Sequence, residues 1–206
     1  MSLIPPTAPS RCGFVSILGL PNVGKSTLLN ALLGCKVSIV SPKPNTTRQG
    51  IRGILHLPTV QLIFVDTPGW LLGTQPLRRA LRRAAHAAAA DADVALVVVA
   101  VDSMAPVITP ELDGILGLAK RVGRPLVVAL NKIDRLEYKE MLLPWMQLLA
   151  GQPGVSAVIP ISARRHEGLE ILVDALAAPM PEGPALFPED MHTDQAERVL
   201  CAELVR

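Results

Sequence analysis

The residues from Gly19 to Thr27 have the types and the spacing of a loop that binds phosphate. They fit the pattern Gly-x-x-x-x-Gly-Lys-Ser/Thr, and they lie between an apolar run at 14–18 and a helix-like run at 27–33. In such a strand–loop–helix context, backbone N–H groups and the positive end of the helix face the phosphate oxygens, and the glycines allow close approach. Lysine then places a cation beside the β- and γ-phosphates, and the serine hydroxyl is a Mg²⁺ ligand. The predicted phosphate-binding residues are Gly19, Asn22, Val23, Gly24, Lys25, Ser26 and Thr27.

A second run, Asp-Thr-Pro-Gly at 66–69, ends another apolar segment 41 residues after Lys25. After a phosphate loop, an aspartate at this place holds Mg²⁺, usually through water, and the glycine N–H senses the γ-phosphate. Alone, such a run is commonly a simple turn. We therefore predict metal binding by Ser26 and Asp66, and γ-phosphate contact by Gly69, from the order of the motifs rather than from this run alone.

The third run, Asn-Lys-Ile-Asp at 131–134, predicts the base that is bound. The Asp134 carboxylate can accept hydrogen bonds from the N1–H and the exocyclic amine of guanine, whereas adenine lacks these donors and would leave the carboxylate unpaired. We expect Asn131 to join this loop to the phosphate loop and the Lys132 stem to lie on the base. Ser162 and Ala163 follow the last predicted strand, where their backbone N–H groups can meet guanine O6.

Short apolar strands alternate with helical segments along the chain, which predicts an α/β three-layer sandwich with a mostly parallel six-stranded sheet. The link between the second and third strands is too short for a crossover helix, so that pair should be antiparallel. Pro144 predicts a kink or a split in the fourth helix. The predicted strands are 14–18, 51–56, 61–65, 94–101, 126–130 and 157–161, and the predicted helices are 25–33, 77–90, 110–121, 138–149 and 169–177.

The ordered set of motifs resembles the translation-factor-like P-loop GTPases, and among them the Era type. The Asn-Thr-Thr-Arg run at 45–48 is similar to the first switch of that group. The resemblance implies GTP and GDP as ligands, with Mg²⁺ held by Ser26, Asp66 and Thr47, or Thr46 in its place. Lys25, Thr47 and Gly69 are then the catalytic residues. Trp70 stands where signalling GTPases carry a water-orienting glutamine, so intrinsic hydrolysis should be slow.

Two features leave alternatives open. In related GTPases the residue that matches Asn22 helps to hold K⁺, which predicts potassium-accelerated hydrolysis; the alternative is that Asn22 only shapes the loop. Arg78, Arg79, Arg82 and Arg83 would form one basic patch at helical spacing, either as a solvated helix face or as an RNA phosphate contact.

Composition divides the chain into four predicted parts. A flexible N-terminus spans 1–11, a folded domain spans 12–178, a proline-rich linker spans 179–192, and a helix-like run at 193–206 begins a second domain. The resemblance to the Era type implies that the first is a G domain and that the second is a truncated KH-type RNA-binding domain. The tail resembles the linker into the KH domain of Era. It implies a role in small ribosomal subunit assembly, with 16S rRNA bound mainly through the missing KH domain.

The formal net charge of +2 is too small to indicate nucleic-acid binding by itself, and the three cysteines are too scattered for a zinc site or a disulfide framework. The N-terminus has no signal-peptide pattern, and the apolar region at 84–101 is interrupted by polar residues before it could span a membrane. We expect a cytoplasmic monomer, with peripheral association at the inner membrane as an open alternative. The other functional hypotheses are a sister GTPase for tRNA modification or a double-domain ribosome GTPase, and a nucleotide-gated binding module with negligible hydrolysis.

Overall fold

The described residues of the three predicted motifs lie at the carboxyl ends of parallel strands in one sheet. A computed structural model of the 206-residue chain describes residues 10–35, 37, 51–66, 83, 85–101 and 106–193. Its described strands form one six-stranded sheet in the order β2-β3-β1-β4-β5-β6, in which β2 is antiparallel to β3 and all other neighbours are parallel. The strands are β1 (Arg11–Gly19), β2 (Ile51–His56), β3 (Val60–Asp66), β4 (Val94–Ala100), β5 (Leu126–Asn131) and β6 (Val155–Pro160).

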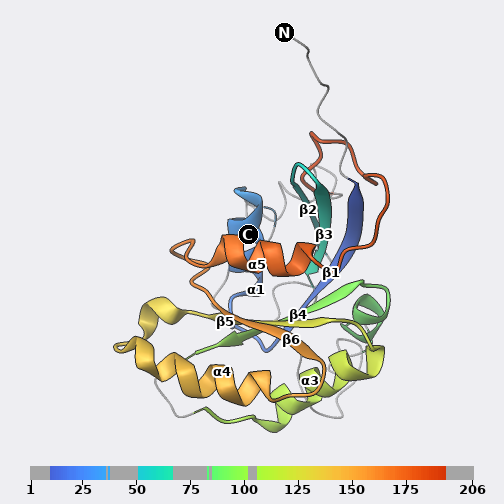
Figure 1. The fold of residues 1–206 in the computed structure, drawn as a ribbon. Helices are drawn as coiled ribbons and strands as arrows, with labels where there is room; N and C mark the ends of the chain where they lie inside the picture. The colour runs from blue at the N-terminus through green and yellow to red at the C-terminus, as the bar shows by residue number, and fades with distance from the viewer. Residues whose placement is uncertain are drawn as a thin grey trace.

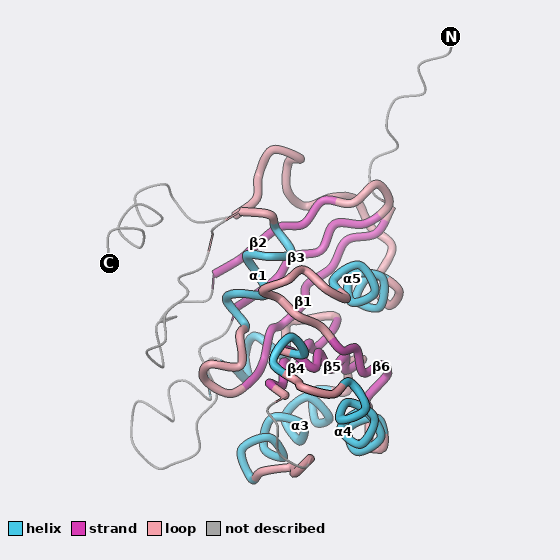
Figure 2. The backbone as a smooth tube through the Cα atoms, turned by 90° about the vertical axis from the view of Figure 1, so that its left-hand side faces the viewer, coloured by secondary structure: helices cyan, strands magenta, loops and turns pink. Residues whose placement is uncertain are grey.

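Helices cover both faces of this sheet, as Figures 1 and 2 show. α1 (Lys25–Leu33) and α5 (Leu169–Ala177) lie on one face, and α3 (Pro110–Val122) and α4 (Leu142–Ala150) lie on the other. Residues 85–90 are also helical. The predicted fold class, a three-layer sandwich with one antiparallel strand pair, is confirmed. Every described helix is too short or too polar to cross a membrane.

The two layers of core follow from the alternation of side chains along the strands. Within β4, Leu96 and Val98 belong to the cluster that packs against α1 and α5, whereas Ala95, Val97 and Val99 belong to the cluster against α3 and α4. Both sets are apolar because both faces of the strand are covered. This explains why the central strands contain near-continuous valine, leucine and alanine.

The predicted fourth helix, 138–149, is split. A 3₁₀ turn (Lys139–Met141) precedes α4, and Pro144 lies in the first turn of α4. Amides in the first turn of a helix have no intrahelical acceptor, so the missing proline N–H costs no bond there. A second 3₁₀ turn (Ile133–Arg135) follows β5 directly and carries Asp134.

Candidate functional site

The loop between β1 and α1 has the geometry of an anion site. Gly24 caps α1 with a φ of 102°, and no side chain bonds to the first amides of the helix. A Cβ atom at Gly24 would collide with the Asn131 amide, and one at Gly19 would lie 2.6 Å from the Val98 carbonyl oxygen. Glycine is therefore required at both positions by close packing. The uncapped N–H groups at the start of α1 are free to meet an anion.

Lys25 is a buried cation at the centre of this loop. Its side chain is 8% exposed, and its Nζ donates to the carbonyl oxygens of Gly19 at 3.1 Å and Leu20 at 2.9 Å. Burial lowers the pKa of Lys25 to about 8, and the nearby Asp66 carboxylate only partly opposes the shift. An incoming anion would favour the charged form, because an opposite charge close by stabilises the ammonium group.

The Asn131 side chain joins three loops. Its Nδ2 donates to the Val23 carbonyl oxygen at 2.9 Å, and its Oδ1 accepts from the backbone N–H groups of Lys132 at 2.8 Å and Ala163 at 3.0 Å. The link from Asn131 to the phosphate loop is confirmed. The side chain is 3% exposed, so these bonds are made away from water.

The Asp134 carboxylate is held by the side chain of Ser162, a residue for which only a backbone role was predicted. The Ser162 hydroxyl donates to Asp134 Oδ1 at 2.6 Å and accepts from Arg165 N–H at 3.2 Å. The hydrogen bond from Ser162 is the main reason that the pKa of Asp134 lies below its ordinary value. A charged, oriented carboxylate is what recognition of two N–H donors on a base needs.

A second hydrogen bond joins the base loop to the phosphate loop. Lys132 Nζ donates to the Asn22 carbonyl oxygen at 2.6 Å, and both residues have positive φ angles, 71° and 62°. The stem of Lys132 thus bridges from the base loop to the phosphate loop, in the position expected for a side chain that lies along a bound base.

Two of the residues predicted to bind Mg²⁺, Ser26 and Asp66, lie side by side in the structure. The Ser26 hydroxyl lies 3.1 Å from Asp66 Oδ2, and Asp66 is fully buried at the end of β3. Hydroxyl and carboxylate oxygens are ligands that Mg²⁺ prefers, and Mg²⁺ at a phosphate site takes few protein ligands.

Several predicted residues lie outside the part of the chain that the structure describes. They are Thr46, Thr47, Gly69, Trp70, Arg78, Arg79 and Arg82. Arg83 is described as exposed and helical. The roles assigned to these residues stay predictions.

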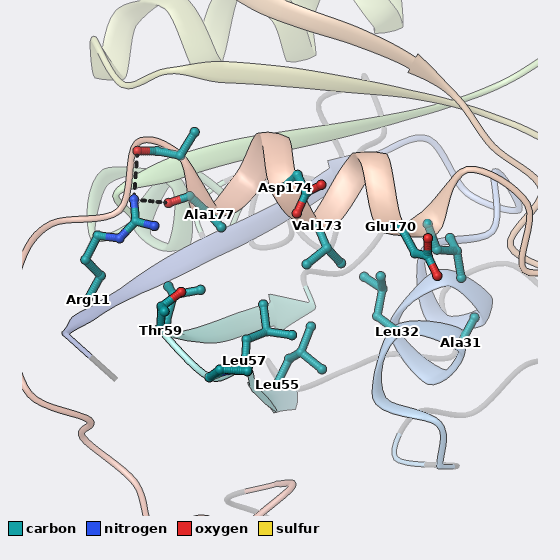
Figure 3. A pocket seen from close by; sticks show the side chains of 14 residues that line it. Arg11, Ala31, Leu32, Leu55, Leu57, Thr59, Glu170, Val173, Asp174 and Ala177 are labelled. Atoms are coloured by element: carbon teal, nitrogen blue, oxygen red, sulfur yellow. Dashed lines mark hydrogen bonds between the residues drawn. The ribbon is translucent and has the colours of Figure 1, made fainter. Parts of the chain in front are cut away.

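A hollow of about 890 Å³ lies elsewhere, between α1, the β2–β3 hairpin and α5 (Figure 3). Its floor is apolar, with Leu32, Leu55 and Val173 among its lining residues, and Arg11 closes one end by donating to the carbonyl oxygens of Ala177 and Ala178. None of the predicted phosphate- or base-binding residues lines it. The chemistry of the motifs therefore places the candidate site at the loops, away from this hollow.

Binding of Mg²⁺ and GDP should take up protons near pH 9. The pKa of Lys25 is about 8, so most of its side chain is neutral there, and the diphosphate raises that pKa and recharges the amine. At about pH 6 the amine is already charged and uptake should vanish. Calorimetric titration in buffers of different ionisation enthalpy measures the proton count. Equal counts at the two pH values, or none near pH 9, would contradict a role for Lys25 as the buried phosphate cation.

Known proteins share both the sequence and the fold of this chain. A protein-family model described as "50S ribosome-binding GTPase" matches residues 14–132. The GTPase Era of Marinobacter nauticus is 46% identical over 204 residues, which are 98% of this chain and 65% of that protein. The GTPase Era of Pseudomonas syringae pv. tomato is 44% identical over 201 residues, 97% of this chain and 66% of that protein. The chain thus spans about 65% of the length of these relatives.

Solved structures agree with this similarity. A crystal structure of Era in complex with MgGDPNP and nucleotides 1506–1542 of 16S ribosomal RNA matches with a TM-score of 0.86 and 39% identity. It covers 95% of this chain and 65% of the Era chain. An Aquifex aeolicus Era variant bound to GDP·AlF4⁻ matches with the same TM-score, identity and coverage. Because the family model matches more than half of the chain, the chain belongs to the family of 50S ribosome-binding GTPases, and Era GTPases are among its relatives.

Proposed function

We propose that this protein is a GTP-binding, GTP-hydrolysing molecular switch of the Era type. The observation that carries the proposal is the side chain of Asn131, which ties the phosphate loop to both loops that would surround a guanine base. A guanine nucleotide with Mg²⁺ would bridge the start of α1 and the ends of β5 and β6.

In this mechanism the chain positions the nucleotide and supplies charge. The first amides of α1 and the Lys25 ammonium bind the phosphates, and Asp134 fixes the base. Ser26 and Asp66 would hold Mg²⁺, which neutralises charge on the β- and γ-phosphates when bound. Thr47 would complete the metal site and Gly69 would contact the γ-phosphate. Loss of that phosphate removes the last two contacts, so both switch segments relax after hydrolysis.

The Asp134→Asn variant tests the specificity for guanine. The asparagine amide can accept from N1–H of the base but cannot accept from the exocyclic amine of guanine, whereas its N–H can donate to the carbonyl oxygen that xanthine carries there. GTP affinity should fall about 10- to 100-fold, the effect of losing one charged hydrogen bond. Affinity for the xanthosine nucleotide should rise. Competition binding with both nucleotides measures the two changes.

Glu137→Gln is the matched control, because Glu137 is an exposed carboxylate three residues along the same loop. It removes the same charge without touching the base, and GTP affinity should stay unchanged. A GTP affinity that Asp134→Asn leaves intact would overturn the assignment of Asp134 to guanine.

We include potassium in the proposal. Asn22 lies at a positive-φ position of the phosphate loop, and its carbonyl oxygen accepts from Lys132, so its backbone is held within that loop. GTP hydrolysis should be faster in KCl than in NaCl at equal ionic strength. Equal rates in single-turnover assays would restrict Asn22 to shaping the loop.

We also propose the domain division and the partner. Residues 12–178 would form the nucleotide domain, 179–192 the linker, and 193–206 the first part of a KH-type domain that binds 16S rRNA in the small ribosomal subunit. The support is that an Era relative with 39% identity is solved with a 16S rRNA segment and that this chain spans 65% of it. A cytoplasmic monomer fits this role, and attachment to the inner membrane is a further hypothesis.

Co-sedimentation with purified small ribosomal subunits tests the partner. The 206-residue chain and a full-length Era relative would each be spun with a non-hydrolysable GTP analogue and with GDP. We expect the relative to pellet with the subunits and the chain to pellet weakly. If the 206-residue chain pelleted with the subunits as strongly as the full-length relative does, the proposal that RNA is bound mainly through a KH domain would be contradicted.

A further inference from the structure

Gln61 is a fully buried residue near the start of β3, and both polar atoms of its side-chain amide are bonded. Its Oε1 accepts from the backbone N–H groups of Leu186 at 2.8 Å and Phe187 at 3.1 Å, and from the Cys12 thiol at 3.4 Å. Its Nε2 donates to the Phe187 carbonyl oxygen at 2.7 Å and to His56 Nδ1 at 3.2 Å. A buried amide is costly unless it is satisfied in this way.

The segment that Gln61 holds is the one that follows α5. Within this segment, the Gln61 side chain bonds to backbone groups of residues 186 and 187, so it acts toward them as a neighbouring strand would. Across the sheet it lies opposite Cys12 in β1 and His56 in β2, which brings all three strands into the contact. Figure 1 shows the segment, coloured orange to red, passing from the end of α5 to the β2–β3 hairpin.

Further bonds fasten the segment at both ends. Near its start, Cys12 N–H donates to the Pro181 carbonyl oxygen at 3.2 Å, and Gly183 N–H donates to the Ser10 carbonyl oxygen at 3.0 Å. Near its end, His56 Nε2 donates to the Met191 carbonyl oxygen at 2.9 Å, and Ile54 N–H donates to that of His192 at 2.9 Å. Residues 181–193, here called the strap, are thus bonded to β1, β2 and β3.

The strap leaves the hairpin in a defined direction. Gly53 and Thr193 form an antiparallel bridge on the free edge of β2. Because this bridge is antiparallel, the strap at Thr193 runs opposite to β2, toward the end of β2 at which Ile51 lies. Ile51 pairs with Asp66, the predicted metal-binding residue. The strap therefore points to the nucleotide end of the hairpin.

The same hairpin connects the two predicted switch segments. β2 begins at Ile51, four residues after Thr47, and β3 ends at Asp66, three residues before Gly69. A shift of the hairpin between nucleotide states would act on every group bonded to it. The strap is bonded to it at Gln61, His56 and Ile54, and only Gln61 among these three bonds to two strap residues with its side chain.

We propose that Gln61 is a positioning residue that couples the nucleotide state to the middle of the strap, by locking residues 186 and 187 to the hairpin between the two switch segments. The inference rests on the proposed GTP switch and extends it to the route by which the switch is transmitted. Without the Gln61 amide, the strap would keep its bonds to β1 and β2 at its two ends, but residues 186 and 187 would no longer follow the hairpin.

Hydrogen exchange of the 206-residue chain tests the coupling. Exchange in the strap would be compared between MgGDP and a Mg²⁺-bound non-hydrolysable GTP analogue. In the wild type, the strap amides should exchange at different rates in the two states. In Gln61→Leu, which keeps the size and loses the amide, strap exchange should rise at least about tenfold, as loss of more than one hydrogen bond implies. At residues 186 and 187 it should also become the same in both nucleotide states, while nucleotide affinity is retained.

Gln152→Leu is the matched control, because Gln152 Nε2 donates to the Leu148 carbonyl oxygen within the α4 region and makes no contact with the hairpin. It should leave strap exchange as in the wild type. Leu186→Pro weakens the same contact from the strap, because it removes the backbone N–H that donates to Gln61 Oε1. Leu186 is 58% exposed, so this variant leaves the core intact and can be used if Gln61→Leu does not fold. It should reduce the difference between nucleotide states.

Two results would overturn the coupling. The first is a wild-type strap whose exchange is equal in both nucleotide states, which needs no variant. The second is a difference between states that survives intact in Gln61→Leu, or in Leu186→Pro if Gln61→Leu does not fold. Failure of the GTP switch itself would show separately, as absence of guanine-nucleotide binding in the wild type.

Discussion

The site depends on one buried side-chain amide, that of Asn131. The phosphate loop follows β1, the base loop follows β5, and the loop with Ser162 follows β6, and these three loops are distant in sequence. Asn131 bonds to all of them with Nδ2 and Oδ1, and at 3% exposure its bonds do not compete with water. Removal of that amide would leave buried N–H and C=O groups in two other loops without this partner. The amide thus sets the distance between the phosphate subsite and the base subsite.

The predicted base-binding loops and the predicted switch segments lie on different strands of the sheet. The base-binding loops follow β5 and β6. The β2–β3 hairpin lies at the opposite end of the sheet and links the predicted switch segments, and the strap is bonded to it. In the proposed mechanism, recognition of the base and response to the γ-phosphate therefore rest on different strands.

Sequence patterns predicted the sheet, the antiparallel hairpin and the bounds of α1, α3 and α5 closely, because apolar runs and glycine or proline ends fix these locally. Of the predicted helix at 77–90, only residues 83 and 85–90 are described, and these are helical. The loop motifs also came together as expected, since parallel strands bring their carboxyl ends to one edge. Two side chains were missed. The Ser162 hydroxyl was assigned only a backbone role, and Gln61 was taken as an ordinary strand residue. Each acts through a partner far along the chain, 28 residues away for Asp134 and more than 120 for Phe187, and no local pattern encodes such contacts.

The measurement that tests the account most directly is backbone amide NMR of the chain titrated with MgGDP and with MgADP. The account predicts that MgGDP shifts the amides of residues 22–27, 131–134 and 162–163 together at one affinity, and that MgADP shifts them far less. It would be contradicted by equal responses to the two nucleotides. It would also be contradicted by shifts centred on the hollow between α1, the hairpin and α5, because that result would place the nucleotide away from the Asn131 junction.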